Sequence, residues 1–497
     1  MDRLNIVFSD SKGIINRNIY GHFAEHIGGV FYDGLWVGED SPVENVRGFR
    51  KALVESFKKL NPPVLRWPGG CFAETYDWRD GIGSREKRPT RVNWWYSHDK
   101  RTESNQVGTH EFIDLCRMVG AEPYFAANMT TVTPLHIRDW VEYCNHPGGT
   151  TLSDERRANG AEAPFDIQFW GIGNENWGGG GQMTPEMCAR EYVRYSTVIN
   201  SLDKGKLKFI LCGPNGHDVE WTSRLMKEWA ARKWQEAPTY GMSVHYYCGN
   251  AGDPVAFTKD EWYRQLHQAD FMRKVLDDHR AAMIPYDPDK KIGIIVDEWG
   301  CWHKDGSGPS KGYNLFEQQS SMRDAVVAAH TLNIFNDRCD SVVMANVAQL
   351  VNNLHSLYLT AGDKFIETPN YHVFDLYKGH MGARQLRVVN GCGQIGRDEF
   401  AAMPRVSASA SEAQDGSVTI TMANMEYDQD IELELTGVDG SIEGKAEIAL
   451  LRGDVPQAHN TFENPFCVKP AYSAIELKQD GRVTLPAASV MSLRIVR

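Results

Sequence analysis

The sequence of 497 residues lacks the features that mark several large classes of protein. It holds no uninterrupted apolar run of the roughly 20 residues that a membrane-spanning helix needs, and its start, MDRLNIVFSD, shows no basic segment followed by an apolar core. Lysine and arginine number 53 against 65 acidic residues, so the formal net charge is −12, and they form no dense cluster. We therefore expect no secretory or membrane-spanning segment and a cytoplasmic location, with nucleic acid and anionic membranes as poor partners.

The ten cysteines occur singly, without the paired short spacings of a zinc site or the density of a disulfide scaffold. The four glycines at 178–181 are not followed by the Lys-Ser/Thr pair of a phosphate-binding loop. We expect reduced cysteines that mostly pack in the core, and neither a metal nor a cofactor. Cys71 and Cys301 lie beside the motifs described next, so a role in lining a site stays open for both.

The sequence does contain two apolar runs that each deliver a glutamate to a loop with glycine and tryptophan. The stretch FDIQFWGIGNENWGGGG at 165–181 places Glu175 after a strand-length run, and IGIIVDEWGCW at 292–302 does the same with Glu298. A single glutamate after a strand is more often a loop carboxylate that caps the next helix. Two of them match glycoside hydrolysis, in which one carboxyl group protonates the leaving oxygen while the other attacks the anomeric carbon or activates water.

Eight apolar runs alternate with segments of helical spacing, which predicts an α/β fold: a (β/α)8 TIM barrel rather than an open sheet. The two glutamates end the fourth and seventh runs, 123 positions apart, and three strand-helix units of roughly 30 to 45 residues fit between them. The carboxyl ends of barrel strands form the functional face, so both side chains should project from the same rim. The expected strands lie at 18–25, 63–70, 121–128, 167–172, 207–213, 241–247, 292–298 and 341–347.

Past residue 385 the pattern changes to short runs, several of which alternate apolar with polar residues between turn signals such as Asp480-Gly481. This is typical of an appended C-terminal antiparallel β-sandwich, jelly-roll-like in form. Residues 4–8 also have the pattern of a strand and could join it. We therefore expect a catalytic barrel at 16–384 and a sandwich domain formed by 1–15 and 385–497. Its expected strands lie at 406–410, 418–422, 431–435, 446–450, 473–477, 483–485 and 490–495.

An ordered set of motifs runs over most of the chain: NIYGHFAEHIGG at 18–29, LRWPGG at 65–70, GIGNEN at 171–176, SVHYY at 243–247, DEW at 297–299, ANVAQLVN at 345–352 and NTFENP at 460–465. With these motifs the chain resembles glycoside hydrolase family 51, the retaining α-L-arabinofuranosidases. The resemblance implies an exo-acting enzyme that removes terminal, non-reducing α-L-arabinofuranosyl units from arabinan- or arabinoxylan-derived oligosaccharides by double displacement. It also implies a barrel with an appended sandwich, no cofactor, and a homo-oligomer that is often a hexamer.

The resemblance assigns roles to particular residues. Glu298 would be the nucleophile, and Glu175 the acid/base that its surroundings keep protonated until it donates to the departing oxygen. Asn174 would bind the sugar 2-hydroxyl, Glu25 and Gln349 would bind other sugar hydroxyls, and Tyr246 and Tyr247 would be further substrate contacts. Apart from the resemblance, Cys71 is a candidate contact because it lies beside a motif, and Trp302 because an aromatic face suits the C–H surface of a sugar. One of the two tyrosines should hold the nucleophile's carboxylate; we favour Tyr247 and keep Tyr246 open. Arg66 could stabilise the ionised nucleophile or form a purely structural salt bridge.

Two positions depart from the commonest family pattern, because many members carry Asn where this chain has Cys71 and Gly300. Neither departure touches the two carboxylates, but both bear on how the sugar is held. A β-xylosidase or an endo-β-glucanase with the same barrel and carboxylate pair therefore stays an alternative. A more remote one is a carbohydrate-binding protein whose barrel has lost catalysis.

Overall fold

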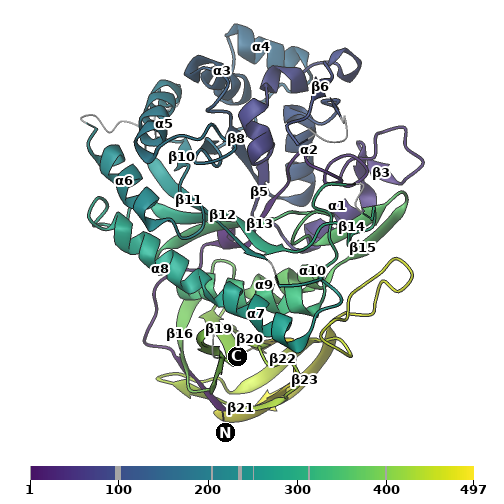
Figure 1. The fold of residues 1–497 in the computed structure, drawn as a ribbon, viewed down its shortest axis with the longest axis vertical. Helices are drawn as coiled ribbons and strands as arrows, with labels where there is room; N and C mark the ends of the chain where they lie inside the picture. The colour runs from purple at the N-terminus through teal and green to yellow at the C-terminus, as the bar shows by residue number, and fades with distance from the viewer. Residues whose placement is uncertain are drawn as a thin grey trace. The chain divides into compact units, whose positions relative to one another are not determined.

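A computed structural model of the protein describes residues 2–95, 102–202, 205–232, 238–249, 251–311, 314–397 and 400–496. Within these residues eight strands close into a barrel in the order β2, β5, β8, β9, β10, β11, β12, β13 (Figure 1). Each strand overlaps the apolar run that predicts it, so the predicted barrel is confirmed. The strands are Gly21–Phe23, Val64–Trp67, Glu122–Ala127, Phe169–Ile172, Lys208–Leu211, Thr239–Gly249, Gly293–Trp302 and Val342–Ala348.

The barrel strands are mainly apolar because both of their faces are covered. All four residues of β9 are buried, as are nine of the ten residues of β12. Neighbouring strands from β2 to β11 pair in parallel, which brings their carboxyl ends to one rim. The first of these strands is short, and a 3-10 turn, Arg17–Tyr20, precedes it.

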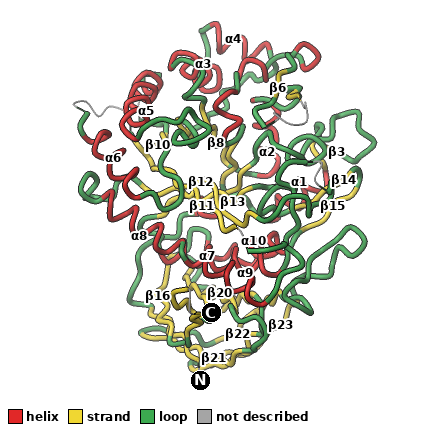
Figure 2. The backbone as a smooth tube through the Cα atoms, in the orientation of Figure 1, coloured by secondary structure: helices red, strands yellow, loops and turns green. Residues whose placement is uncertain are grey.

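Helices follow the barrel strands, and several begin at a recognisable cap. The Oγ1 atom of Thr184 accepts from the N–H of Met187 at the start of α5, and Pro185 occupies the first helical position, where no N–H is needed. In Figure 2, α5 and α6 lie outside β10. The helices are α1 Lys51–Lys59, α2 Thr109–Val119, α3 Pro134–Asn145, α4 Thr151–Ala158, α5 Pro185–Asn200, α6 Val219–Ala230, α7 Lys259–Asp270, α8 Met272–Met283, α9 Met322–Asp337 and α10 Pro369–Tyr377.

The chain forms two compact units. The first unit contains residues 1–20, 247–275 and 299–497, and the second contains residues 21–246 and 276–298. The second unit holds the barrel strands β2, β5, β8, β9 and β10, most of β11, and β12 as far as Glu298. The first unit holds β13, the helices α7, α9 and α10, and the C-terminal strands.

In the first unit, nine strands of the described chain form one sheet in the order β23, β22, β25, β20, β19, β16, β1, β21, β24. The N-terminal strand β1, Asp2–Val7, runs antiparallel to β16, Arg384–Asn390, and parallel to β21, Ile431–Val438. Buried residues of strands from both halves of the sheet share one hydrophobic core, so the sheet folds over on itself as in a sandwich. The other strands are β19 Val406–Glu412, β20 Val418–Asn424, β22 Gly444–Leu451, β23 Ala471–Leu477, β24 Asp480–Leu485 and β25 Val490–Val496.

The predicted antiparallel β domain is confirmed, and each of its seven expected strands is present. The alternation is clearest in β21, where Ile431, Leu433 and Leu435 are buried. The sequence analysis missed β16, in which only Gln385 and Leu386 are fully buried, so the strand carries no periodic signal.

The described helices include none that is both long and apolar enough to cross a membrane. All ten cysteines lie within the described residues and are free; eight are buried, Cys392 is half-buried and Cys467 is exposed.

Candidate active site

Two glutamates of the second unit lie in or just beyond barrel strands. Glu175 lies three residues beyond the last residue of β9, Ile172, and has a φ of 44°. A residue other than glycine in this left-handed region carries a conformational cost of about 1 kcal/mol or more, and such positions gather at functional sites. Glu298 lies inside β12, and only 7% of its surface is exposed.

A histidine connects the two carboxylates. His245 lies near the end of β11 and is 5% exposed. Its Nδ1 atom is 2.9 Å from Oε1 of Glu175 and 3.5 Å from Oε2 of Glu298. One carboxylate oxygen of each glutamate and one ring nitrogen of the histidine lie within 4.8 Å of one another. The sequence analysis named His245 only as part of the SVHYY motif and did not identify it as a site residue.

The charges of Glu175, His245 and Glu298, the candidate catalytic triad, determine which of the three side chains holds a proton. Burial alone would lower the pKa of His245, but the negative charge of Glu298 and the hydrogen bond to Glu175 outweigh it and raise this pKa to about 9. Burial would raise the pKa of Glu175, but the hydrogen bond and charge of His245 outweigh it and lower the pKa. These shifts favour His245 over Glu175 as the proton carrier without substrate, and the acid/base role of Glu175 stays a prediction.

Arg66, at the end of β5, contacts Glu298 directly. Its Nη1 donates to Oε1 of Glu298 at 2.8 Å, and its Nη2 donates to Oδ1 of Asn174 at 2.7 Å. Nε of Arg66 also lies 3.6 Å from Oδ2 of buried Asp297, so the structure contains the contacts of both predicted roles, and the choice between them stays open. The second bond also fixes the orientation of the Asn174 amide, since only its oxygen accepts from an arginine.

Gly70 allows this close approach. A Cβ atom at position 70 would lie 2.7 Å from Oε1 of Glu298, and 3.4 Å from Nδ2 of Asn174. Any side chain at this position would therefore displace the carboxylate or the amide.

Glu74 is a buried carboxylate that the sequence analysis missed. Its Oε1 accepts from the backbone N–H of Asn174 at 2.6 Å and from Nδ2 of Asn176 at 3.2 Å, and its Oε2 accepts from the N–H groups of Met129 and Thr130, both at 2.9 Å. These bonds connect the loops that follow β5, β8 and β9. Glu74 therefore holds the segment that carries Asn174 and Glu175.

Glu25 and Cys71 lie in the same unit. Oε1 of Glu25 accepts from the N–H of Phe72 at 3.0 Å and from Nε1 of Trp95 at 2.9 Å. Burial, followed by the charge of Glu298, raises the pKa of Glu25 to about 7. The thiol of Cys71 donates to Oε2 of Glu175 at 3.5 Å. Burial and the neighbouring carboxylates raise the pKa of this thiol, so it stays protonated at neutral pH.

The remaining predicted sugar contacts are placed as follows. Tyr246, in the second unit, is half-buried on β11. Tyr247, Trp302 and Gln349 belong to the first unit. There the rings of Tyr247 and Trp302 meet edge to face with centroids 5.1 Å apart, while Gln349 is 2% exposed and directly follows β13. The roles of these four residues as sugar contacts stay predictions.

A parallel barrel that brings two strand-end glutamates within 4.8 Å of each other, one of them bound to an arginine, defines a glycoside hydrolase. Residues 56–253 match the α-L-arabinofuranosidase 1 domain, and residues 297–489 match the α-L-arabinofuranosidase C-terminal domain. An intracellular exo-α-L-arabinofuranosidase of Bacteroides ovatus is 39% identical over 97% of this chain and 93% of its own. The GH51 arabinofuranosidase of Xanthomonas axonopodis pv. citri superimposes over 100% of both chains with a TM-score of 0.93 and 36% identity. The chain belongs to glycoside hydrolase family 51 and is an α-L-arabinofuranosidase.

A further solved structure carries a sugar. The α-L-arabinofuranosidase of Thermotoga maritima in complex with arabinose is 30% identical over 100% of both chains, with a TM-score of 0.85. Its likeness extends through both the barrel and the C-terminal β domain of this chain.

Proposed function

We propose that the enzyme releases terminal, non-reducing α-L-arabinofuranosyl units with retention of configuration, with Glu298 as nucleophile and Glu175 as acid/base. The observation that carries this proposal is the separation of the two carboxylates, whose nearest oxygens lie within 4.8 Å. Retaining enzymes hold their carboxyl groups about 5 to 5.5 Å apart, whereas inverting enzymes need about 6.5 to 9.5 Å to admit a water.

In the first step, a carboxylate oxygen of Glu298 forms a bond to the anomeric carbon while the bond to the leaving oxygen breaks. Nη1 of Arg66 donates to Oε1 of Glu298 at 2.8 Å, which fixes the direction in which this carboxylate attacks. Nδ2 of Asn174 has a weak contact of 3.9 Å with the sulfur of Cys71. It is therefore in a position to donate to the sugar 2-hydroxyl, a bond that strengthens in the transition state.

His245 supplies the proton that Glu175 donates. When Glu298 becomes an ester it loses the negative charge that raises the pKa of His245. The proton then moves from Nδ1 of His245 to Oε1 of Glu175, which lies 2.9 Å away. From either oxygen of Glu175 it is passed on to the leaving oxygen, which departs as an alcohol. In the second step, the Glu175–His245 pair takes a proton from water, whose oxygen attacks the anomeric carbon and releases Glu298.

The sugar would be held by the residues that the family resemblance names. Glu25 presents a carboxyl group with a pKa near neutrality beside Cys71 in the second unit. Cys71 occupies a position where many relatives have Asn, and it offers a weaker hydrogen-bond donor. Tyr246, Tyr247, Trp302 and Gln349 complete the proposed set.

We propose further that the enzyme works in the cytoplasm on arabinan- or arabinoxylan-derived oligosaccharides and that it is a homo-oligomer. The Bacteroides ovatus relative is described as intracellular and exo-acting, and the Thermotoga maritima relative binds arabinose. The family resemblance favours a hexamer. The boundaries of the catalytic domain, 16–384, and of the sandwich, 1–15 and 385–497, also remain proposals; Met1 and Arg497 lie outside the described residues.

The test compares hydrolysis of p-nitrophenyl α-L-arabinofuranoside, β-D-xyloside and β-D-glucoside by the wild type, Glu175→Ala and Glu298→Ala, with and without azide. We expect the arabinoside to be the best substrate and Glu298→Ala to lose activity by on the order of 10⁴-fold or more. With azide, Glu175→Ala should give an arabinofuranosyl azide of retained anomeric configuration. A preference for a β-glycoside would contradict the assignment of the sugar, and an azide product of inverted configuration from Glu175→Ala would contradict the roles of the two glutamates.

A further inference from the structure

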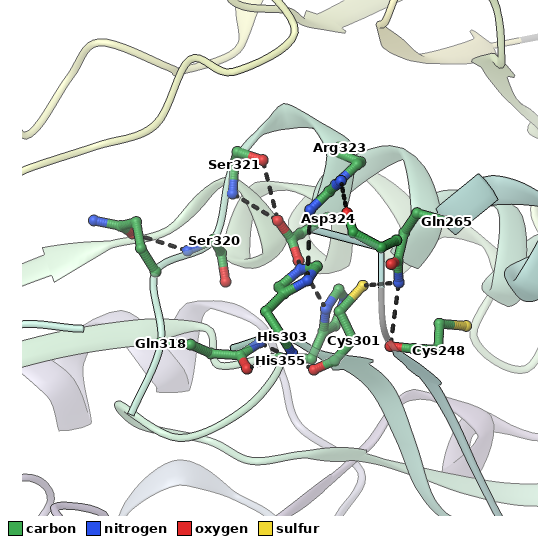
Figure 3. A network of polar contacts seen from close by, with 12 residues as sticks. Cys248, Gln265, Cys301, His303, Gln318, Ser320, Ser321, Arg323, Asp324 and His355 are labelled. Carbon is green, nitrogen blue, oxygen red and sulfur yellow. Dashed lines mark hydrogen bonds and ion pairs between the residues drawn. The ribbon is translucent and has the colours of Figure 1, made fainter. Parts of the chain in front are cut away.

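The first unit contains a second buried cluster of groups that bind metals, made of residues that have no part in the proposed reaction. Cys301 of β12, Asp324 of α9 and His355 of the loop between β13 and β14, Tyr358–Ala361, are each 0% exposed. Their sulfur, oxygen and nitrogen atoms lie within 4.8 Å of one another. Figure 3 shows the histidines of this cluster beside Asp324, with the sulfur of Cys301 next to them.

His355 is the unusual member of the cluster. Neither of its ring nitrogens has a hydrogen-bond partner within the described part of the chain, although both are buried. Its Nδ1 lies 3.7 Å from Oδ1 of Asp324, too far for a hydrogen bond. The imidazole thus has the Asp324 carboxylate beside it at ion-pair distance but no hydrogen bond, and a buried polar group in this state is costly and leaves room for a ligand between the two side chains.

Gly300 creates the space for His355. A Cβ atom at position 300 would lie 2.4 Å from the Cβ of His355, and Gly300 has a φ of 143°, which other residues rarely adopt. Glycine at position 300 therefore admits an imidazole beside the strand that carries Glu298 and Cys301.

The other two members are already oriented. The backbone N–H and the Oγ of Ser321 hold Oδ2 of Asp324 at 2.8 and 3.1 Å, which turns Oδ1 toward the histidines. His303 donates from Nε2 to Oδ1 at 2.8 Å, because its Nδ1 faces the guanidinium of Arg323 at 3.4 Å. Such hydrogen bonds to a carboxylate are typical of the outer shell of metal sites.

The sulfur of Cys301 also has a donor beside it. Nε2 of Gln265 lies 3.3 Å from this sulfur and donates at the same time to the carbonyl of Cys248. Gln318 fixes the backbone on both sides of the site, since it donates to the carbonyl of Cys301 and accepts from the N–H of His303. An N–H group directed at sulfur stabilises a thiolate, the form in which cysteine binds metals.

We propose that Cys301, Asp324 and His355 bind one zinc-type divalent ion, with water in the fourth position. A thiolate, an imidazole and a carboxylate form a ligand set that zinc favours, and tetrahedral zinc places such atoms roughly 3.3 to 3.8 Å apart. The sulfur, oxygen and nitrogen ligand atoms would therefore move up to about 1 Å closer together when zinc binds. Binding forms a sulfur–metal bond and releases the thiol proton of Cys301 to solvent.

The ion would join three segments at one point. It would connect the end of β12, three residues after Glu298, with the first turn of α9 and with the loop that follows β13. Arg323, the nearest cation, also feels the charges of Glu261 and Asp253, so its positive charge is not balanced by Asp324 alone. The inference concerns a structural site and does not depend on the proposed reaction.

The experiment measures metal content and the cobalt spectrum of the full-length enzyme. Protein grown with added zinc and dialysed against metal-free buffer should retain about one zinc per chain, and less than about a tenth of that in Cys301→Ser and His355→Phe. Cys248→Ser, which changes a buried cysteine outside the set, is the matched control and should keep the zinc. Apo-enzyme titrated with Co²⁺ should show a thiolate-to-cobalt charge-transfer band that Cys301→Ser abolishes.

The catalytic triad of Glu175, His245 and Glu298 is the competing site, with the thiol of Cys71 beside it. If Cys71→Ser or Glu175→Gln removes the zinc or the cobalt band, the ion binds there and the proposal is wrong. It is equally wrong if the wild type retains no zinc and shows no cobalt–thiolate band. If the Cys301 and His355 variants fail to fold, the cobalt spectrum of Cys71→Ser decides the question. A cobalt–thiolate band in that variant supports the site of Cys301, Asp324 and His355, and the loss of the band overturns the proposal.

Discussion

His245 gives the most decisive prediction, because it separates two accounts of the acid/base. The rise of its pKa from 6.5 to about 9 corresponds to a preference of about 3 kcal/mol for the charged imidazole. In the free enzyme the proton needed for catalysis is therefore on His245, and it is lost only as the pH rises through about 9. The alkaline limb of kcat/KM reports this ionisation.

Replacing His245 by Gln moves the catalytic proton to Glu175. Without the histidine, burial is no longer opposed by a charged hydrogen-bond donor, so the pKa of Glu175 rises above its ordinary value. The alkaline limb of the variant should therefore begin at a lower pH than that of the wild type, whose limb follows the His245 pKa of about 9, and at pH 9 the variant should lose the larger share of its own maximal kcat/KM.

The assay is kcat/KM between pH 4 and pH 10 with 4-methoxyphenyl α-L-arabinofuranoside, whose poor leaving group needs a proton. His217→Gln is the matched control, because His217 pairs with Asp278 at 2.6 Å on the surface of the same unit, and its profile should match the wild type. An alkaline limb in His245→Gln at the wild-type position would refute the reasoning, since the proton would then not be held by His245.

Three further predictions concern neighbouring residues. Glu74→Gln leaves the N–H of Asn174 and other buried donors without an anionic acceptor, so the free energy of unfolding measured in urea should fall by about 2 to 4 kcal/mol. The same variant should lower kcat more than it changes KM, and an unchanged kcat would contradict the positioning role of Glu74. Because the pKa of Glu25 is raised to about 7 in the folded protein, the wild type loses stability as the pH rises from about 4.5 to 7. Glu25→Gln should therefore be more stable than the wild type by up to about 3 kcal/mol at pH 8, and equally stable at pH 4.5. A difference of the same size at both pH values would refute this. The protonated thiol of Cys71 should resist N-ethylmaleimide at pH 7.5 while exposed Cys467 reacts, so peptide mapping should find Cys467 labelled in fully active enzyme; inactivation in step with labelling of Cys71 would count against it.

The barrel was predictable from the sequence because its strands are buried on both faces. A strand such as β9 or β12 therefore appears as an unbroken apolar run, and the polar residue that ends the run marks the functional rim. The same rule placed Glu175 and Glu298 together. It could also have identified His245, which is the last buried residue before the half-buried tyrosines of β11.

Contacts between segments far apart in the sequence could not be predicted in this way. Glu74 accepts hydrogen bonds from donors at positions 129, 130, 174 and 176, and no local sequence spacing predicts such bonds. The same holds for Cys301, Asp324 and His355, whose spacing matches no zinc motif. The lowered pKa of Glu175 could not be predicted either, because it depends on the charge and hydrogen bond of His245, which lies 70 positions away in the sequence.

The place of β1 in the C-terminal sheet has a consequence for synthesis of the chain. Leu4 pairs with Asn390 and Asp2 with Leu433, so β1 is synthesised long before the two strands it pairs with. At roughly 5 to 20 residues per second, this delay is on the order of tens of seconds on the ribosome. During that time both edges of β1 lack their partners, so the sheet can close only after β21 has emerged.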